Sequence, residues 1–293
     1  MLKAYKVAGC IFHLELPESE VLCSRLTQYD PFETEPVEDP VFSLKLVKEL
    51  EDMPLEVAYD APTEPGETVV RLYHAGEGWQ FEMAPNSDCP ISGRMRSDKD
   101  FTSGVLQIAS NRLSDAVFAI NNSLMLLFAF STAGKGILEM HASVIRNSGR
   151  AFLFLARSGT GKSTHSSLWL ENVPGSDLLN DDNPIVRVWP DGKVICYGSP
   201  WSGKTPCYRN IECPVGAFVR IRRCAENKIE RLGLLDSYAL IYSSSSGYKT
   251  DRQMGDYMHN TIEKVVTSCD CYVLDCRPDR EAAEVCSKQV LGL

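Results

Sequence analysis

The chain has 293 residues, of which 44% are hydrophobic and 24% are charged, and this is the composition of an ordinary globular protein. Its length allows one large domain or two smaller ones. A formal net charge of -9 argues against a general nucleic-acid partner, which needs a basic face, but it leaves room for a local basic pocket that binds phosphate.

The apolar stretches and the cysteines indicate a cytoplasmic protein with no membrane partner. No long apolar segment follows Lys3 and Lys6, so no signal peptide is expected. The most apolar run, residues 124–130, is too short to cross a bilayer and is interpreted as the buried face of a helix. The eleven cysteines have irregular spacing and no Cys-x-x-Cys pair, which favours reduced, buried thiols over a zinc site.

Residues 1–110 are predicted to form a β-rich N-terminal region. β-branched and aromatic residues indicate strands within 3–16 and within 68–83, where the chain turns at 75–78. The acidic, proline-bearing stretch 30–40 is predicted to be a loop. Residues 112–132 have helical spacing, with Ser114 as the N-cap and Gly134 as the stop. Apolar residues surround most of this helix, so it is expected to pack between layers.

The remaining chain, residues 111–293, is predicted to form an α/β domain. Apolar runs at 137–145 and 151–156 indicate two strands separated by a turn at 147–149. Pro190, Asp191 and Gly192 indicate a hairpin between strands at 185–189 and 193–197. Further elements are expected as helices at 162–171, 234–243, 251–267 and from 280, and as a strand at 271–275.

Residues 156–164, A-R-S-G-T-G-K-S-T, fit the phosphate-loop pattern with alanine in place of its first glycine. A predicted strand precedes this loop and a predicted helix follows it. The glycines allow successive N–H groups to turn toward anionic oxygens, and the helix N-terminus adds its positive dipole end. The loop therefore predicts binding of ATP with Mg²⁺. The alternative is an incidental glycine-rich turn. The expected nucleotide contacts are Ser158, Gly159, Thr160, Gly161, Lys162, Ser163 and Thr164, with Lys162 on the outer phosphates and Ser163 on the metal.

An acidic pair, Asp181 and Asp182, follows two leucines in the segment L-L-N-D-D-N. A phosphoryl transferase needs one carboxylate at the metal and another near the attacking hydroxyl. Such a cluster is also typical of a solvated turn, but its position after a phosphate loop favours catalysis. We expect Asp181 to orient or deprotonate the hydroxyl and Asp182 to lie nearer the metal. The reverse assignment is left open.

Three further positions are weaker candidates. His141, on the strand before the phosphate-loop strand, is either structural or a catalytic residue. The segment G-S-P-W-S-G-K-T at residues 198–205 lacks the strand–loop–helix context of a nucleotide loop and suggests a shaped rim. Within it, Lys204 is either a contact for phosphate or an acidic substrate, or part of a plain surface loop. Arg209 is a second candidate substrate contact.

The order of His141, the loop at 156–164 and the Asn-Asp-Asp segment resembles the catalytic domain of HPr kinase/phosphorylase, which is similar in fold to the nucleotide domain of phosphoenolpyruvate carboxykinase. HPr-kinase-like bacterial proteins resemble the chain more closely, over residues 136–225. The resemblance implies phosphate binding at the loop, a catalytic carboxylate at Asp181 or Asp182, and a supporting role for His141. The stretches shared with these proteins are H-A-S, S-G-T-G-K-S-T-H, L-L-N-D-D-N-P and G-S-P-W-S-G-K-T.

The chain departs from true HPr kinases in one important respect. Residues 198–205 stand where those enzymes have a glycine-rich recognition segment, so HPr itself is not the expected substrate. We expect a kinase that transfers the γ-phosphoryl group of ATP to a hydroxyl of a protein, peptide or small molecule. A carboxykinase acting on oxaloacetate and a nucleotide-binding module without turnover are the alternatives. The acceptor, a reverse phosphorolysis and the oligomeric state, a homo-oligomer included, are left open.

Overall fold

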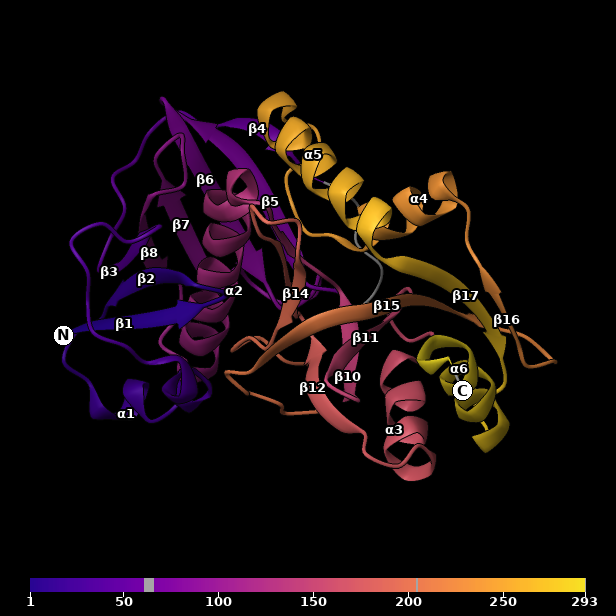
Figure 1. Ribbon diagram of the computed structural model, residues 1–293. Coiled ribbons are helices and arrows are strands. Elements are labelled where there is room, and N and C mark those ends of the chain that lie inside the picture. Colours follow the sequence, from indigo (N-terminus) through magenta and orange to yellow (C-terminus); the bar gives the residue numbers. More distant parts are fainter. Residues whose placement is uncertain (61–65, 204, 293) are drawn as a thin grey trace. The chain divides into compact units, whose positions relative to one another are not determined.

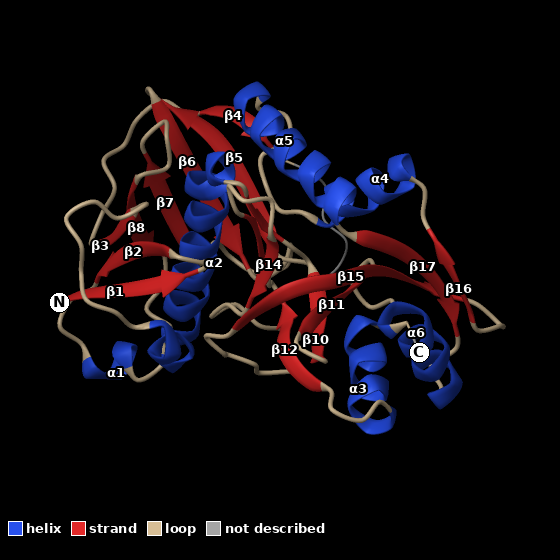
Figure 2. Cartoon of the chain, viewed as in Figure 1, coloured by secondary structure: helices blue, strands red, loops and turns tan. Residues whose placement is uncertain are grey.

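The computed structural model describes residues 1–60, 66–203 and 205–292. The chain divides into two compact units, Met1–Thr132 and Ala133–Leu293, each with its own sheet and helices (Figures 1 and 2). The fold is therefore mixed α/β. The division falls later than the boundary placed at residue 110 from the sequence, because helix α2 (Leu113–Thr132) packs against β6, β7 and β8 of the first unit.

The first unit is built on an eight-stranded sheet with the order β1-β2-β3-β8-β7-β6-β5-β4. The pairs β2/β3 and β3/β8 are parallel, and the other pairs are antiparallel. The predicted turn between two strands near residue 76 is confirmed by the β5/β6 hairpin. The elements are β1 (Leu2–Val7), β2 (Cys10–Glu15), α1 (Glu20–Cys23), η1 (Thr27–Phe32), β3 (Ser43–Val47), β4 (Glu56–Tyr59), β5 (Val69–Ala75), β6 (Gly78–Ala84), β7 (Gly93–Ser97) and β8 (Ser103–Ile108).

Helix α2 is the main helix of the first unit. With the short turn after it, residues 113–135, it is long and apolar enough to cross a membrane by length and composition, but 56% of its most apolar window is buried. Phe128 packs on Phe12 at 6.1 Å between ring centroids, as in the core helix of a globular unit. The prediction of Ser114 as the N-cap is wrong, since the helix already begins at Leu113. Asp115 accepts hydrogen bonds from Ser110 Oγ and Arg112 Nε instead.

The second unit contains a nine-stranded sheet with the path β12-β10-β11-β15-β14-β13-β9, to which β17 and β16 are added beside β15. The long strand β15 pairs with β11 and β17 in parallel and with β14 antiparallel. The elements are η2 (Ala133–Lys135), β9 (Ile137–Glu139), β10 (Ala142–Asn147), β11 (Arg150–Leu155), α3 (Lys162–Asn172), β12 (Asp177–Asp182), β13 (Ile185–Val188), β14 (Val194–Tyr197), β15 (Glu212–Arg223), β16 (Lys228–Arg231), α4 (Leu234–Ser244), α5 (Arg252–Ser268), β17 (Asp270–Cys276) and α6 (Arg280–Leu291).

Helices cover both faces of this sheet, which explains the unbroken apolar sequence of its central strand. On β11, Phe152 and Phe154 pack into the core that includes Trp169 of α3 and residues of α6, whereas Leu153 and Leu155 enter the core beneath α4 and α5. Figure 1 shows the helix pairs α3/α6 and α4/α5 on opposite sides of the strands. Both faces of the strand are buried, so neither needs polar residues.

The structure corrects one predicted strand and adds several that were not predicted, β15 among them. Residues 137–145 form two strands, β9 and β10, which are interrupted at Met140 and His141. The N–H groups of these two residues donate to Pro184 O and Ser244 O at 3.0 and 2.7 Å. Most residues on both sides of the break are buried and apolar, so the sequence reads as one strand, although Glu139 directly before the break is a buried charged residue. The strand β15 was not predicted, since it contains proline, glycine and exposed arginines.

Other predicted elements are confirmed. The turn at Ser148 and Gly149 joins β10 to β11, with φ of 49° and 71°, and the hairpin of β13 and β14 pairs as expected. Helices α3, α4, α5 and α6 and the strand β17 lie within a residue or two of their predicted positions.

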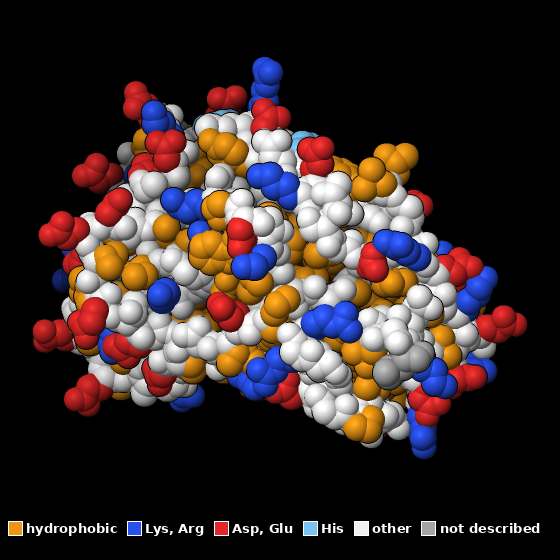
Figure 3. Space-filling model, viewed as in Figure 1, with side chains coloured by type: hydrophobic (Ala, Val, Ile, Leu, Met, Phe, Trp, Pro, Cys, Tyr) orange, Lys and Arg blue, Asp and Glu red, His pale blue; other side chains and the backbone are white. Residues whose placement is uncertain are grey.

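The surface and the thiols agree with an ordinary globular protein. In Figure 3, acidic and basic side chains are interspersed over the visible face, without a large area of one sign. No disulfide joins any of the eleven cysteines, all of which lie in the described residues.

The central position of β11 leads to a prediction on stability. Leu153 is fully buried, so Leu153→Ala should lower the free energy of unfolding by about 2–5 kcal/mol through lost burial and a cavity. Leu235 is 85% exposed, so Leu235→Ala should change the free energy of unfolding by no more than about 0.5 kcal/mol. Urea denaturation of the two variants measures both values, and similar losses would contradict the layered arrangement.

Candidate functional site

The predicted phosphate loop connects β11 to α3 in the second unit. Gly159 and Gly161 have φ of +71° and +127°, a region that favours glycine, and the space beside both Cα atoms is empty. Gly161 is the N-cap of α3 and provides no side-chain cap, so the N–H groups of the first turn remain available to a ligand. The chain thus forms an open loop at a helix N-terminus, which is an anion-binding geometry.

A cavity of about 370 Å³ lies over this loop. It brings together residues that are distant in sequence: the loop and α3, His141 between β9 and β10, and the acidic pair at the end of β12. Of the predicted nucleotide contacts, only Thr160 faces elsewhere, into a neighbouring cavity. The lining residues are His141, Ser158, Gly159, Gly161, Lys162, Ser163, Thr164, Asp181, Asp182 and Gly203.

Lys162, His141 and Asp182 form a chain of polar contacts across the cavity. Lys162 Nζ lies 2.6 Å from His141 Nε2 and donates to Ala156 O at 3.2 Å. His141 Nδ1 lies 3.2 Å from Asp182 Oδ1. Burial lowers the pKa of the Lys162 ammonium, and the charges of Asp182 and Asp181 partly oppose this effect. If Lys162 donates to Nε2, the ring carries its proton on Nδ1 and donates it to Asp182.

Asp181 occupies a different environment from its neighbour. It is only 3% exposed, and its Oδ1 accepts a hydrogen bond of 3.0 Å from Ser163 Oγ. Its Oδ2 is buried and has no hydrogen-bond partner within the described residues. An unsatisfied buried carboxylate oxygen is costly, so a further partner is needed when the site is filled.

Asp182 is held in a strained conformation at the end of β12. Its φ of +133° lies in a region that residues with a Cβ rarely adopt. Its side chain is 33% exposed and accepts a hydrogen bond from Asn183 Nδ2 at 3.1 Å. A Cβ added to Gly203 would lie 3.1 Å from the Asp182 Cβ, so the glycine leaves room for this side chain. The strain sets the two carboxylates in different directions.

The segment that starts at Gly198 forms a rim along the acidic pair. Ser202 Oγ and Gly203 N donate to Asp181 O at 3.0 and 2.5 Å. The buried Asn180 side chain binds Ser199 and Trp201 from the adjacent position on β12. These contacts agree with the shaped rim predicted from the sequence, but they involve Ser202 and Gly203, which the sequence did not single out.

The structure does not bring Arg209, one of the two candidate substrate contacts, into the cavity. Arg209 Nη2 binds Asp177 Oδ2 at 3.0 Å, and its Nη1 contacts Leu178 O. Asp177 begins β12, at the opposite end of the strand from Asp182. The ion pair with Asp177 gives Arg209 a structural partner. Lys204 lies outside the described residues.

The donor set fits Mg²⁺, although no group of three or more His, Cys, Asp or Glu within the described ranges could hold a metal by itself. Mg²⁺ usually keeps several waters and takes one or two carboxylates together with phosphate oxygens. The Ser163 hydroxyl and the unsatisfied Asp181 Oδ2 supply that chemistry. The sequence placed Asp182 nearer the metal, whereas in the structure Asp181 is the neighbour of Ser163.

Comparison with known proteins finds no family and only a low structural similarity. No protein-family model and no curated protein matches the chain. Among solved structures, the HPr(Ser) kinase/phosphatase from Coxiella burnetii is similar, with a TM-score of 0.32 and 9% sequence identity, over 53% of this chain and 97% of that chain. A similarity at this level leaves the function to be judged from the site itself.

The strain at Asp182 can be measured. Asp182→Gly and Asp182→Ala both remove the carboxylate, but only alanine keeps the Cβ that opposes a φ of +133°. The glycine variant should therefore be the more stable by about 1–3 kcal/mol in urea denaturation. Equal stability would show that the conformation costs nothing.

Proposed function

We propose that this chain binds ATP with Mg²⁺ and transfers the γ-phosphoryl group to a hydroxyl. The observation that supports this proposal is the single cavity in which an open glycine loop at a helix N-terminus meets a buried lysine and two carboxylates of different exposure. Phosphoryl transfer needs these groups together: donors for the phosphates, a cation, a metal ligand and a base.

The phosphates would lie against the N–H groups of the loop and of the first turn of α3. Ala156 O and His141 hold Lys162 beside the loop, where its ammonium would contact the outer phosphates. Ser163 and Asp181 would hold the Mg²⁺, which neutralises charge on the β- and γ-phosphates when bound. Asp181 is buried and hydrogen-bonded to Ser163, which suits a metal ligand better than a base.

Asp182 is the proposed general base, because its carboxylate is exposed enough to meet an incoming hydroxyl. It would accept the hydroxyl proton as the acceptor oxygen bonds to the γ-phosphorus, while the bond to the β–γ bridging oxygen breaks and ADP leaves. His141 would position Asp182 through Nδ1 and hold Lys162 through Nε2 before the nucleotide arrives. These roles reverse the assignment of the acidic pair made from the sequence.

A nucleotide-binding module without turnover is the second candidate. The observation against it is the strain at Asp182, because backbone strain of this kind persists where function requires it. A carboxykinase gains no support, since the described cavity contains no His/Lys set for a second metal beyond His141 and Lys162. The acceptor is proposed only as a hydroxyl of a protein, peptide or small molecule.

Nucleotide binding should raise the melting temperature, since a ligand that binds only the folded state stabilises it. Lys162→Ala should remove most of the shift produced by MgATP, because the cation for the outer phosphates is lost. Lys193→Ala is the matched control: its ammonium is 73% exposed and pairs with Asp191 on a hairpin turn. Thermal denaturation with and without MgATP gives the shifts. An unchanged shift in Lys162→Ala contradicts the phosphate site.

Variants of the two carboxylates should have different effects, one on phosphoryl transfer and the other on metal binding. Asp182→Asn should bind MgATP nearly normally but transfer phosphate about a hundredfold or more slowly, as for loss of a general base. Asp181→Asn should weaken the Mg²⁺ dependence of nucleotide binding, since it removes the charge beside Ser163. Transfer of γ-labelled phosphate from ATP to lysate proteins and metabolites supplies the assay, with Asp191→Asn as the control. Parental transfer rates in both variants would favour the binding module.

A further inference from the structure

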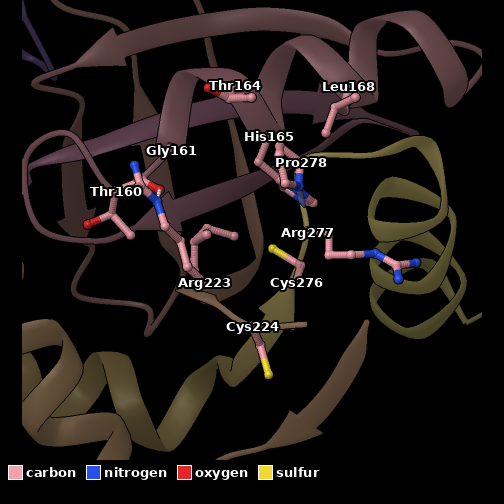
Figure 4. A pocket seen from close by; sticks show the side chains of 11 residues that line it. Thr160, Gly161, Thr164, His165, Leu168, Arg223, Cys224, Cys276, Arg277 and Pro278 are labelled. Atoms are coloured by element: carbon pink, nitrogen blue, oxygen red, sulfur yellow. Dashed lines mark hydrogen bonds between the residues drawn. The ribbon is translucent and has the colours of Figure 1, made fainter. Parts of the chain in front are cut away.

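A second cavity, of about 550 Å³, lies beside the phosphate loop (Figure 4). It shares Gly161 and Thr164 with the cavity that contains the acidic pair. Thr160 faces this second cavity, whereas Ser158 and Gly159 face the first. A ligand whose phosphates lie in the loop can therefore extend past Gly161 into the second cavity.

The walls of the second cavity are largely apolar. Leu168 of α3, Cys276 at the end of β17 and Pro278 just after it line the cavity (Figure 4). Ile221 of β15 lines it as well. The strands β11, β15 and β17 are parallel, so the cavity lies outside their carboxyl ends, where open α/β sheets bind ligands. Two arginines also line the cavity, Arg223 and Arg277, and the guanidinium of Arg277 binds Asp279 and Glu281. An apolar slot edged by such groups suits a flat heteroaromatic ring.

One polar group in this wall lacks a partner. His165 is 2% exposed, and its Nε2 accepts a hydrogen bond of 3.1 Å from Trp169 Nε1. Burial lowers the pKa of the His165 imidazole to about 4, so the ring is neutral near pH 7 and its proton lies on Nδ1. Within the described residues Nδ1 has no hydrogen-bond partner. Less than 1 Å² of this atom is exposed, so a base in the cavity would reach Nδ1 only after the imidazole ring turns.

Arg223 connects the second cavity to the phosphate loop. It follows Ile221 on β15, and its Nε donates to Thr160 O at 2.9 Å while Nη2 contacts Gly159 O. The guanidinium therefore fixes the loop at a set distance from the apolar walls. A ligand that spans both cavities meets two binding regions whose spacing is held by this contact.

We propose that the second cavity binds the base of the nucleotide whose phosphates occupy the loop. This inference rests on the proposed function and deepens it in two ways. The phosphoryl donor is a nucleoside triphosphate rather than an inorganic polyphosphate, since only the former fills the apolar slot. The acceptor must approach from the other side of the loop, along Asp182 and Gly203.

The experiment compares MgATP with magnesium tripolyphosphate, which has the phosphates but no base, by isothermal titration calorimetry. The parent protein should bind MgATP about tenfold or more tightly than tripolyphosphate. Leu168→Trp fills the slot and should bring the MgATP affinity down to that of tripolyphosphate, whose own affinity stays unchanged. Leu170→Trp is the control on the same helix, because Leu170 is 43% exposed and lies outside the cavity.

The outcomes separate this inference from the proposed function. Equal affinity of the parent for the two ligands overturns the base site but leaves the phosphate site standing. Equal weakening of both ligands by Leu168→Trp also overturns it, because the variant then acts on the loop. If neither ligand binds the parent, both proposals fail.

A labelling measurement on the parent protein tests the same inference without a variant. Cys224 is exposed and lines the second cavity. Saturating MgATP should slow its alkylation by iodoacetamide several-fold, whereas tripolyphosphate should not. Cys89, which is half-buried and lies outside the cavity, serves as the internal control in peptide mass spectrometry. Equal protection by both ligands, or protection by neither, contradicts a base site.

Discussion

The burial of one ammonium group organises the candidate site. Lys162 is 9% exposed and begins α3, so its charge is removed from water by the same fold that orients the loop. Such burial is tolerated only where polar partners surround the charge. Here His141 and Ala156 O contact it, and the acidic pair lies close enough to oppose the fall in its pKa. In the proposed function, a bound phosphate would give this ammonium group a stronger partner than the two it has.

The acidic pair shows how adjacent identical residues acquire different properties. Both end the same strand, but Asp181 points into the protein toward Ser163, whereas Asp182 is turned outward by its strained φ and by the space at Gly203. The rim at Ser202 and Gly203 holds the backbone of Asp181 in place. One carboxylate is buried and the other is accessible, and the proposed roles in metal binding and proton transfer rest on this difference.

The loop itself separates two cavities with different chemistry. The side that faces the acidic pair is polar and contains the reactive groups, whereas the side that faces β15 and β17 is largely apolar. Arg223 joins the two by its contacts with the carbonyls of Gly159 and Thr160. In the proposed reaction, the base of the donor would occupy the apolar side and the acceptor would approach from the polar side.

The sequence by itself determined the features that depend on local chemistry. Two glycines before Lys162 and Ser163 indicated an anion-binding loop, and periodicity located the helices of the second unit within a residue or two. The tertiary structure decided what depends on contacts between distant segments. In the tertiary structure the strand is interrupted at His141, and Arg209 pairs with Asp177. Ser163 donates a hydrogen bond to Asp181 rather than to Asp182. Those outcomes follow from strand pairing and backbone strain, which a single sequence does not encode locally.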